Sequence, residues 1–396
     1  MRLYNSMSNQ LEEFVVDDNR VGLYVCGVTP YDTTHIGHAF TFLTFDVLVR
    51  YLRFHGYDVT YVQNVTDIDD DILRKSAELG MDWQELGRRE TNQLLDDLHR
   101  LNAVPFDHFV AATQHIDEVI ELVKVLVDKG FAYEANGSVY FSVAKASDFG
   151  KLSHLDPNEM LPIANERGNN PNDPNKMDPL DFVLWQAAKP GEPTWETPWG
   201  PGRPGWHIEC TAMAQKYLGE TFAIHGGGYD LIFPHHECEI AQAENATGEQ
   251  PYVRYWMHAA MVDYHGDKMS KSLGNLVYVR DLLEEYSGDA VRLSLLAHHY
   301  REPWEFFDAD MPLHAANAAA LATAAHETSG SGEALNVDEF QARFLAAMDN
   351  DLDTLTAINV LNELADEVLG AAGMDIRSAQ ATLRELADLV GLVLAA

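Results

Sequence analysis

Apolar and polar positions along the first part of the chain predict strands and helices in alternation. Residues 21–28 form a continuous apolar run that is typical of a short buried strand, and residues 58–65 show the alternation of a second strand. Between them, residues 37–53 have the spacing of an amphipathic helix, which Gly56 ends. A further helix is expected to begin within residues 66–71, capped by a threonine or an aspartate. This order of elements indicates an α/β fold with a doubly wound parallel sheet.

The remaining pattern divides the chain into stretches of different character. Residues 82–131 have helical spacing, and residues 139–143 predict a strand. Residues 156–204 are rich in Asn, Pro and Gly, which predicts loops and an insertion between two halves of the sheet domain. Periodicity then returns, with a helix expected over 207–218, a strand over 222–225, a helix after Pro234 and a last sheet strand over 255–262. Residues 311–396 are rich in Ala and Leu and predict a small helical bundle.

Charge is the unusual feature of the composition. The 396 residues include 27 Lys+Arg and 62 Asp+Glu, which gives a formal net charge of −35. Such a field repels polyanions, so we expect no large nucleic-acid footprint over most of the surface and no DNA partner. The excess of acids is also consistent with a solubility adaptation.

Several classes of protein are excluded by the remaining composition. No apolar run is long enough for a membrane helix, and the first residues lack the apolar core of an export signal. Three cysteines are too few for a disulfide framework in a chain of this length. We therefore expect a cytoplasmic protein whose thiols are free for metal binding or catalysis.

Two short motifs suggest phosphate chemistry. His35-Ile36-Gly37-His38 lies where the first strand gives way to a helix, and a helix N-terminus with free N–H groups and nearby imidazoles favours an anion. Lys268-Met269-Ser270-Lys271-Ser272 places two lysines three residues apart in a segment suited to a mobile loop. Such a loop can close over a triphosphate and neutralise the charge that develops on pyrophosphate.

These two motifs, in this order, resemble the signature pair of the class I aminoacyl-tRNA synthetases. Longer segments narrow the resemblance to the cysteinyl-tRNA synthetase family: Tyr24-Val25-Cys26-Gly27, Asn64-Val65-Thr66-Asp67-Ile68-Asp69-Asp70, Gly202 to Cys210 and His225 to Glu237. The resemblance implies a Rossmann-like catalytic domain that uses ATP, with Mg²⁺, to activate L-cysteine as cysteinyl adenylate. It further implies transfer of the cysteinyl group to the 3′ end of tRNA-Cys.

The resemblance also assigns residues to roles. Those implied in catalysis are His35, His38, Lys268 and Lys271. Those implied in binding ATP or the adenylate are Gly37, Gly227, Gly228, Asp230, Ser270 and Ser272. Those implied around the cysteine substrate are Gly27, Thr66, Trp206 and His225. The segments that it implies are a first catalytic half (1–111), a connective insertion (112–204), a second catalytic half with the metal site (205–262), the Lys-Met-Ser-Lys-Ser loop with a stem-contact region (263–310) and the helical bundle (311–396).

A metal site is expected from four residues that match the family's zinc ligands. Cys26 and Cys210 lie at the ends of predicted elements, and His235 and Glu239 are four residues apart on one helix face. Two thiolates, an imidazole and a carboxylate suit Zn²⁺, which would bind the thiolate of cysteine and reject serine. Cys238 is a possible competing ligand, but its neighbouring position turns it away from the face of Glu239.

Some positions depart from the synthetase pattern and leave the acceptor open. Val28-Thr29-Pro30, Phe40 and the loop Glu166-Arg167-Gly168 resemble a cysteine ligase of the mycothiol pathway, which acylates the amine of a glucosaminyl-inositol. The chain also ends at Ala396, where such synthetases usually continue into a small anticodon-reading region, so a compact form is expected. We place tRNA first and the amino sugar second. An inactive paralogue with a binding role is a third hypothesis, which the intact motifs disfavour.

Overall fold

The computed structural model describes residues 1–269 and 274–395. Within them, the central feature is a parallel sheet of five strands in the order β11-β10-β3-β4-β5. These strands are β3 (Arg20–Val28), β4 (Asp58–Val65), β5 (His108–Ala111), β10 (Phe222–Gly228) and β11 (Val253–Ala259). The strand order reverses between β3 and β10, so their carboxyl ends form a topological switch point, the usual place for a ligand in such a sheet.

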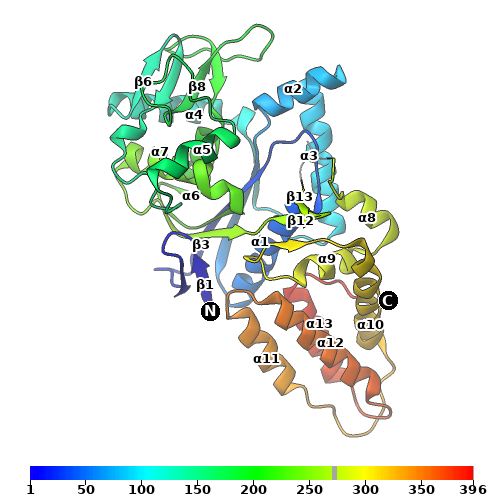
Figure 1. Ribbon diagram of the computed structural model, residues 1–396. Helices are drawn as coiled ribbons and strands as arrows, with labels where there is room; N and C mark the ends of the chain where they lie inside the picture. The colour runs from blue at the N-terminus through cyan, green and yellow to red at the C-terminus, as the bar shows by residue number, and fades with distance from the viewer. Residues whose placement is uncertain (270–273, 396) are drawn as a thin grey trace.

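Helices cover both faces of this sheet (Figure 1). Along β3, Leu23 and Val25 pack into the core that contains α1 (Ile36–Phe54), whereas Tyr24 and Cys26 pack into the core that contains α6 (Trp206–Leu218). This alternation is the period of two expected of a strand with helices on both sides. The doubly wound α/β fold predicted from the sequence is therefore confirmed.

A second, antiparallel sheet lies within the segment expected to be an insertion (Figure 1). Its strands are β6 (Ala132–Ala135), β7 (Ser138–Phe141), β8 (Phe182–Ala187) and β9 (Gly202–Pro204). The helices near it are α4 (Ile116–Asp128), α5 (Pro157–Glu166) and α7 (Glu237–Thr247). Its apolar side chains pack against α4, α6 and α7, so one core joins this sheet to helices that flank the central sheet.

Smaller elements surround the central sheet. The strands are the hairpin β1 (Arg2–Asn5) and β2 (Gln10–Glu13), and the small sheet of β12 (Val262–Tyr264), β13 (Asp267–Lys268) and β14 (Trp304–Glu305). The helices are α2 (Asp70–Leu79), α3 (Trp83–Arg100), α8 (Val279–Glu285) and α9 (Gly288–Leu296). Short turns at Tyr229–Leu231 and Ile232–His236 connect β10 to α7.

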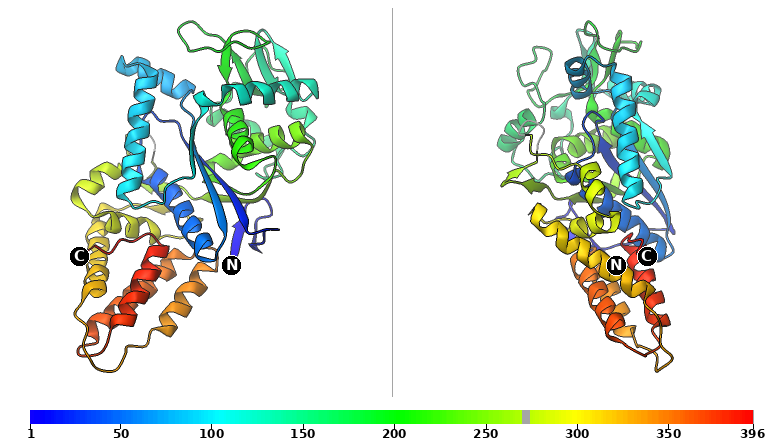
Figure 2. Two further views of the ribbon diagram at one scale, coloured as in Figure 1. Left: turned by 180° about the vertical axis from the view of Figure 1, so that it is seen from behind. Right: turned by 90° about the vertical axis from the view of Figure 1, so that its right-hand side faces the viewer.

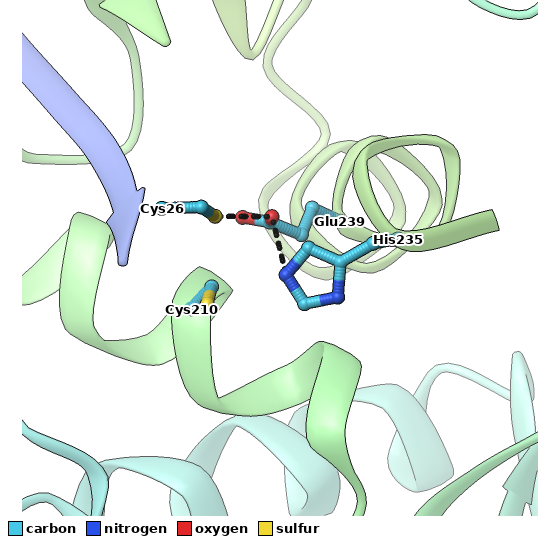
Figure 3. Close-up of side chains that lie close together, drawn as sticks. All are labelled: Cys26, Cys210, His235 and Glu239. Atoms are coloured by element: carbon cyan, nitrogen blue, oxygen red, sulfur yellow. Dashed lines mark hydrogen bonds and ion pairs between the residues drawn. The ribbon is translucent and has the colours of Figure 1, made fainter. Parts of the chain in front are cut away.

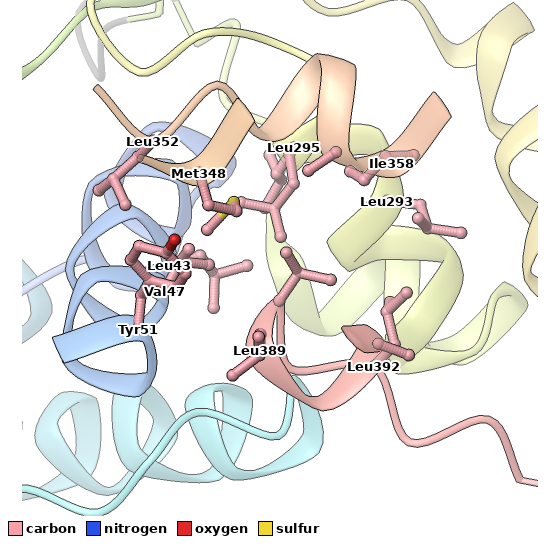
Figure 4. Close-up of a cluster of buried hydrophobic side chains, with 14 of the residues drawn as sticks. Leu43, Val47, Tyr51, Leu293, Leu295, Met348, Leu352, Ile358, Leu389 and Leu392 are labelled. Carbon is pink, nitrogen blue, oxygen red and sulfur yellow. The ribbon is translucent and has the colours of Figure 1, made fainter. Parts of the chain in front are cut away.

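The C-terminal helices form a bundle at the end of the molecule opposite the β6–β9 sheet (Figure 2). They are α10 (Met311–His326), α11 (Asp338–Met348), α12 (Thr354–Gly370) and α13 (Arg377–Leu389). Leu43, Val47 and Tyr51 of α1 meet Leu389 of α13 and Met348 of α11 in one buried cluster (Figure 4). The predicted bundle is thus present and shares a core with the central sheet domain.

Three of the predicted elements need correction. The stretch 82–131, expected to be helical, contains the edge strand β5 between α3 and α4. The stretch 156–204, expected to be loops, contains α5, β8 and β9. The predicted strand 255–262 ends at Ala259 in β11, and Val262 begins β12. Short strands such as β5 carry too few residues for a period of two to stand out against neighbouring helices.

No helix among the described residues is long and apolar enough to cross a membrane.

Candidate active site

A cavity of about 980 Å³ opens at the carboxyl ends of β3 and β10. Its lining comes from several elements: the loop after β3, the start of α1, the insertion, the start of α6, the end of β10 and the segment around Lys268. The switch point of the sheet, the first turn of α1 and the insertion therefore share one open cavity.

Four potential metal ligands meet at one side of this cavity. Single ligand atoms of Cys26, Cys210, His235 and Glu239 all lie within 4.8 Å of one another, and all four side chains are buried. Figure 3 shows them converging from the end of β3, from α6, from the turn Ile232–His236 and from the start of α7. The Sγ of Cys26 lies 3.6 Å from Oε1 of Glu239, and Nε2 of His235 lies 3.2 Å from the same oxygen.

The electrostatics of this cluster favour a bound cation. Burial, together with Cys210 and Glu239, raises the pKa of the Cys26 thiol well above its usual value. Burial lowers the pKa of His235 well below its ordinary value, so its imidazole stays neutral and keeps a lone pair. A divalent ion would favour the deprotonated thiolate of Cys26 and balance the charge of the buried Glu239 carboxylate. The donor set fits zinc.

His207 and Trp206 support His235 from the first turn of α6. Nδ1 of His207 lies 2.9 Å from Nδ1 of His235, and the Trp206 ring centroid lies 4.2 Å from that of His235. Burial lowers the pKa of His207 to about 4, so this contact joins two neutral rings. An outer hydrogen bond of this kind fixes the orientation of a ligating imidazole.

The residues expected around a cysteine substrate occupy two different positions. Gly27 and Trp206 line the cavity. His225 is buried instead behind the cluster, with Nε2 at 3.0 Å from Oε2 of Glu239. The Thr66 hydroxyl lies 2.9 Å from that of Thr29 and does not line the cavity. Gly27 and Trp206 are thus placed to contact a molecule in the cavity directly, whereas His225 lies behind Glu239 and contacts Glu239 instead.

Gly27 is required by a close approach between strands. A Cβ at this position would lie 1.7 Å from the carbonyl oxygen of Asn64, and the Gly27 N–H donates to Oδ1 of Asn64 at 2.8 Å. The side-chain amide of Asn64 lies 3.4 Å from Sγ of Cys210. Because Gly27 has no side chain, the end of β3 can lie close to Asn64, whose side chain contacts the proposed metal ligand Cys210 on α6.

Cys238, the possible competitor, lies on another side of α7. It packs into the core of the β6–β9 sheet and is in neither of the ligand groups found among the described residues. Burial raises the pKa of its thiol well above the usual value.

The expected nucleotide residues line the opposite part of the cavity. His35 and His38 are half-buried at the start of α1, with their rings stacked at a centroid distance of 3.6 Å. Gly37 lies between them, where a Cβ would be 3.0 Å from Cε1 of His35. Lys268 donates to Oδ2 of Asp230 at 3.1 Å, across the mouth of the cavity. His35, Gly37 and His38 of the first signature motif thus face the same space as Lys268 and Met269 of the second.

The glycines after His225 differ in position. Gly228 lines the cavity at the end of β10, whereas Gly227 lies behind it, where a Cβ would be 2.9 Å from Cδ1 of Leu231. The predictions for Ser270, Lys271 and Ser272 lie outside the described residues.

The segment after Gly274 is bonded to the loop before α1. Four hydrogen bonds join them: Ile36 N–H to Val277 O at 2.9 Å, Val279 N–H to Thr34 O at 2.9 Å, Tyr278 O–H to Asp32 at 2.7 Å and Arg280 Nη1 to Thr33 O at 2.9 Å. Residues 277–280, which follow the second signature motif in the chain, are therefore held against the first motif.

Two further cavity residues, Arg167 and Lys176, come from the insertion. Arg167 donates to the backbone carbonyls of Asp230 and Phe233, and Lys176 lines the wall beside Cys238. Burial lowers the pKa of Lys176. In the sequence, Arg167 stands out only as part of the loop Glu166-Arg167-Gly168, and Lys176 only as part of a polar loop, because the Arg167 partners lie more than 60 positions away.

A family model and curated proteins match this chain. Residues 12–316 match the model of the tRNA synthetases class I (C) catalytic domain. The chain is 45% identical to the cysteine–tRNA ligase of Dehalococcoides mccartyi over 401 residues, covering 100% of this chain and 86% of that protein. It is also 45% identical to the cysteine–tRNA ligase of Shewanella loihica over 398 residues, covering 99% and 86% respectively.

A solved structure supports the fold. The methionyl-tRNA synthetase of Mycobacterium tuberculosis in complex with methionyl-adenylate aligns with a TM-score of 0.64 at 16% identity, covering 94% of this chain and 89% of that one. At this identity the likeness concerns the fold alone.

Proposed function

This chain belongs to the cysteine–tRNA ligase family of class I tRNA synthetases, and from that premise we propose how its residues activate cysteine with ATP and charge tRNA-Cys. The observation that carries the proposal is the shared cavity: the Cys26 cluster and the His35–His38 turn open into the same space. Cysteine and ATP are thereby held side by side.

The cysteine side of the site is the buried ligand cluster. Cys26, Cys210, His235 and Glu239 would hold a zinc ion, which would supply a further coordination position for the substrate thiolate. Serine offers a hard hydroxyl of high pKa, so such a position favours cysteine. Gly27 and Trp206 bound the space for the substrate, while Thr66 and His225 act from behind through Thr29 and Glu239.

The nucleotide side combines the two signature motifs. His35 and His38 donate to phosphate oxygens beside the N-terminus of α1, and Gly37 lets the nucleotide approach the backbone. Lys268, with Lys271, Ser270 and Ser272, would close over the β- and γ-phosphates of ATP, which arrives with Mg²⁺. When Lys268 moves to the phosphates, its hydrogen bond to Asp230 would break, and Asp230 would accept a hydrogen bond from the ribose of the adenylate instead. Gly227 and Gly228 would let the adenylate pack closely against the end of β10.

Two displacement steps follow from this arrangement. A carboxylate oxygen of cysteine attacks the α-phosphorus of ATP, and pyrophosphate leaves as the lysines balance its charge. A hydroxyl at the 3′ end of tRNA then attacks the cysteinyl carbonyl, and AMP leaves. We propose that the acceptor end enters beside the insertion, past Arg167 and Lys176, whose positive charge is rare in this acidic chain.

Cysteine-dependent exchange of pyrophosphate into ATP tests the first step. Exchange with cysteine and little with serine is expected, and the absence of exchange by zinc-loaded protein would refute the proposal. A second assay offers tRNA-Cys and glucosaminyl-inositol to the same adenylate. Acylation of tRNA is expected, since the similar curated proteins are cysteine–tRNA ligases; acylation of the amino sugar alone would reverse the choice of acceptor.

We also propose a cytoplasmic location. Cys26, Cys210 and Cys238 are free thiols, which is the state that the reducing cytoplasm maintains.

A further inference from the structure

A second group of buried ligand atoms overlaps the first. The Sγ of Cys26, an oxygen of Glu239 and ring nitrogens of His225 and His236 all lie within 4.8 Å of one another. His225, His236 and Glu239 are fully buried and do not line the cavity, whereas Cys26 and His235 do. The second group is therefore the inner of the two, behind the one that faces the cavity.

Hydrogen bonds orient His236 for metal binding. Its Nδ1 lies 2.8 Å from Nε2 of His258, and Nδ1 of His258 lies 2.8 Å from the hydroxyl of Ser6. When His236 donates to His258 and His258 donates to Ser6, Nε2 of His236 keeps a lone pair. That nitrogen has no hydrogen-bond partner among the described residues and lies 3.9 Å from Oε1 of Glu239. Ligating histidines have this arrangement, with the second nitrogen donating to an outer partner.

His225 reaches the same carboxylate from the other side. Its Nε2 lies 3.0 Å from Oε2 of Glu239, and its ring stacks on Trp256 at a centroid distance of 4.6 Å. A neutral histidine at this place can donate to Glu239 while the ion is in the outer position. In the other tautomer the proton sits on Nδ1, Nε2 has a lone pair, and a small shift of the ring makes Nε2 a ligand.

We propose that Cys26, His225, His236 and Glu239 form an inner position for the divalent ion that the outer group also binds. In the outer group, two thiolates and a carboxylate leave one excess negative charge around a divalent ion. In the inner group, one thiolate and one carboxylate balance the ion. Burial costs less free energy when the charges of the ligands and the ion balance. The outer group offsets its excess charge with a second thiolate, a strong zinc ligand, and with access to the cavity.

The two positions hold one ion at a time. They share Cys26 and Glu239, and two divalent ions would exceed the three anionic ligands by one positive charge in a buried site. The ion therefore works in the outer position and is retained in the inner one when an outer ligand is lost. This inference rests on the metal cluster of the proposed function, but metal retention can be measured independently of cysteine activation.

Metal content of variants of the full-length chain tests the inner position. Each protein is loaded with Zn²⁺ or Co²⁺, freed of unbound ion by gel filtration and assayed for metal and for thermal unfolding. Cys210→Ala removes only the outer group, His236→Asn removes only the inner group, and Cys26→Ala removes both. We expect about one ion per chain in wild type, Cys210→Ala and His236→Asn, with affinity in the double variant Cys210→Ala/His236→Asn reduced a further roughly 10–100-fold below Cys210→Ala.

Cobalt spectra provide the second readout. In Cys210→Ala the thiolate-to-cobalt charge-transfer band should fall to about half its wild-type intensity, because one thiolate remains in place of two. Folded Cys210→Ala that retains no metal would overturn the proposal, as would a double variant that binds as tightly as Cys210→Ala or wild-type protein with two ions. If Cys210→Ala does not fold, His235→Ala replaces it, because His235 also belongs only to the outer group.

Discussion

Among single residues, Gly27 has the least freedom to change. Gly27→Ala would place its Cβ 1.7 Å from the Asn64 carbonyl oxygen and so force β3 and β4 apart beside Cys26. We expect a loss of roughly 1–3 kcal/mol in the free energy of unfolding and a larger loss of cysteine-dependent exchange. Gly22→Ala on the same strand is the control, since its Cβ would come no closer than 3.3 Å to another atom. Equal effects from both variants in urea titrations would contradict this prediction.

A second single residue, His298, should make the stability of the protein depend on pH. Its ring stacks on Trp304 at 3.9 Å, and burial lowers the pKa of His298 to about 4. Below the ordinary value of about 6.5, the unfolded chain takes up a proton that the folded protein refuses. Stability from this group is therefore present above about pH 6.5 and is lost as pH falls toward 4.

The measurement compares wild type with His298→Gln by urea unfolding at about pH 7 and about pH 5. The advantage of the wild type should shrink at the lower pH, because glutamine does not titrate. An advantage of the same size at both values would refute the assignment.

At the level of elements, Arg280 connects α8 to the loop before α1. Its bond to the Thr33 carbonyl helps hold the segment after Gly274 against the His35 turn. Arg280→Ala should slow adenylate formation on the order of tenfold to 100-fold, through kcat with little change in the KM for cysteine. Arg280→Lys should restore part of the rate. Arg254→Ala is the control, since the Arg254 guanidinium pairs with the exposed Asp17 and lies over the Tyr255 ring, and an equal loss there would exclude a positioning role.

The same elements show what the sequence could and could not provide. His35, His38 and the ligand pair His235 and Glu239 are recognisable because each pair is local, and helix geometry relates its members directly. The bond between Tyr278 and Asp32 spans 246 positions and has no local signature. The inner group was missed for a related reason: the resemblance assigned His225 to a substrate pocket, and only the tertiary fold brings His225 of β10 to Glu239 of α7.

Phe40 is another position whose meaning could not be judged from the sequence alone. It is one of the departures from the synthetase pattern that suggest an amino sugar as the acceptor. It departs from the arginine that is common in synthetases, yet its ring is buried against Trp304 at 5.5 Å. The packing with β14 explains an apolar residue there without any change of acceptor. A departure in sequence therefore needs its structural neighbours before it bears on function.

Across the whole molecule, one buried arginine joins the bundle to the catalytic domain. Arg292 of α9 donates to the Val390 carbonyl at 2.8 Å, to the Leu101 carbonyl at 2.7 Å and to Asp46 of α1, and it is fully buried. The three partners come from the ends of α13 and α3 and from the middle of α1. The guanidinium thus links three segments that are distant in sequence by donating a hydrogen bond to each of them. The carboxylate of Asp46 balances its charge.

Asp46→Asn should therefore loosen the contact between bundle and sheet. It leaves Arg292 charged and buried with only carbonyl partners, at a cost of about 3–5 kcal/mol in the free energy of unfolding. Arg343→Ala is the matched control, because its pair with Glu363 lies on the exposed surface of the bundle and contributes about 0–1 kcal/mol. Hydrogen exchange should show early opening of α13 in Asp46→Asn while β3 and β4 stay protected. Uniform loss of protection across the chain would instead mean that bundle and sheet unfold as one unit, and that Arg292 stabilises the whole fold rather than a junction.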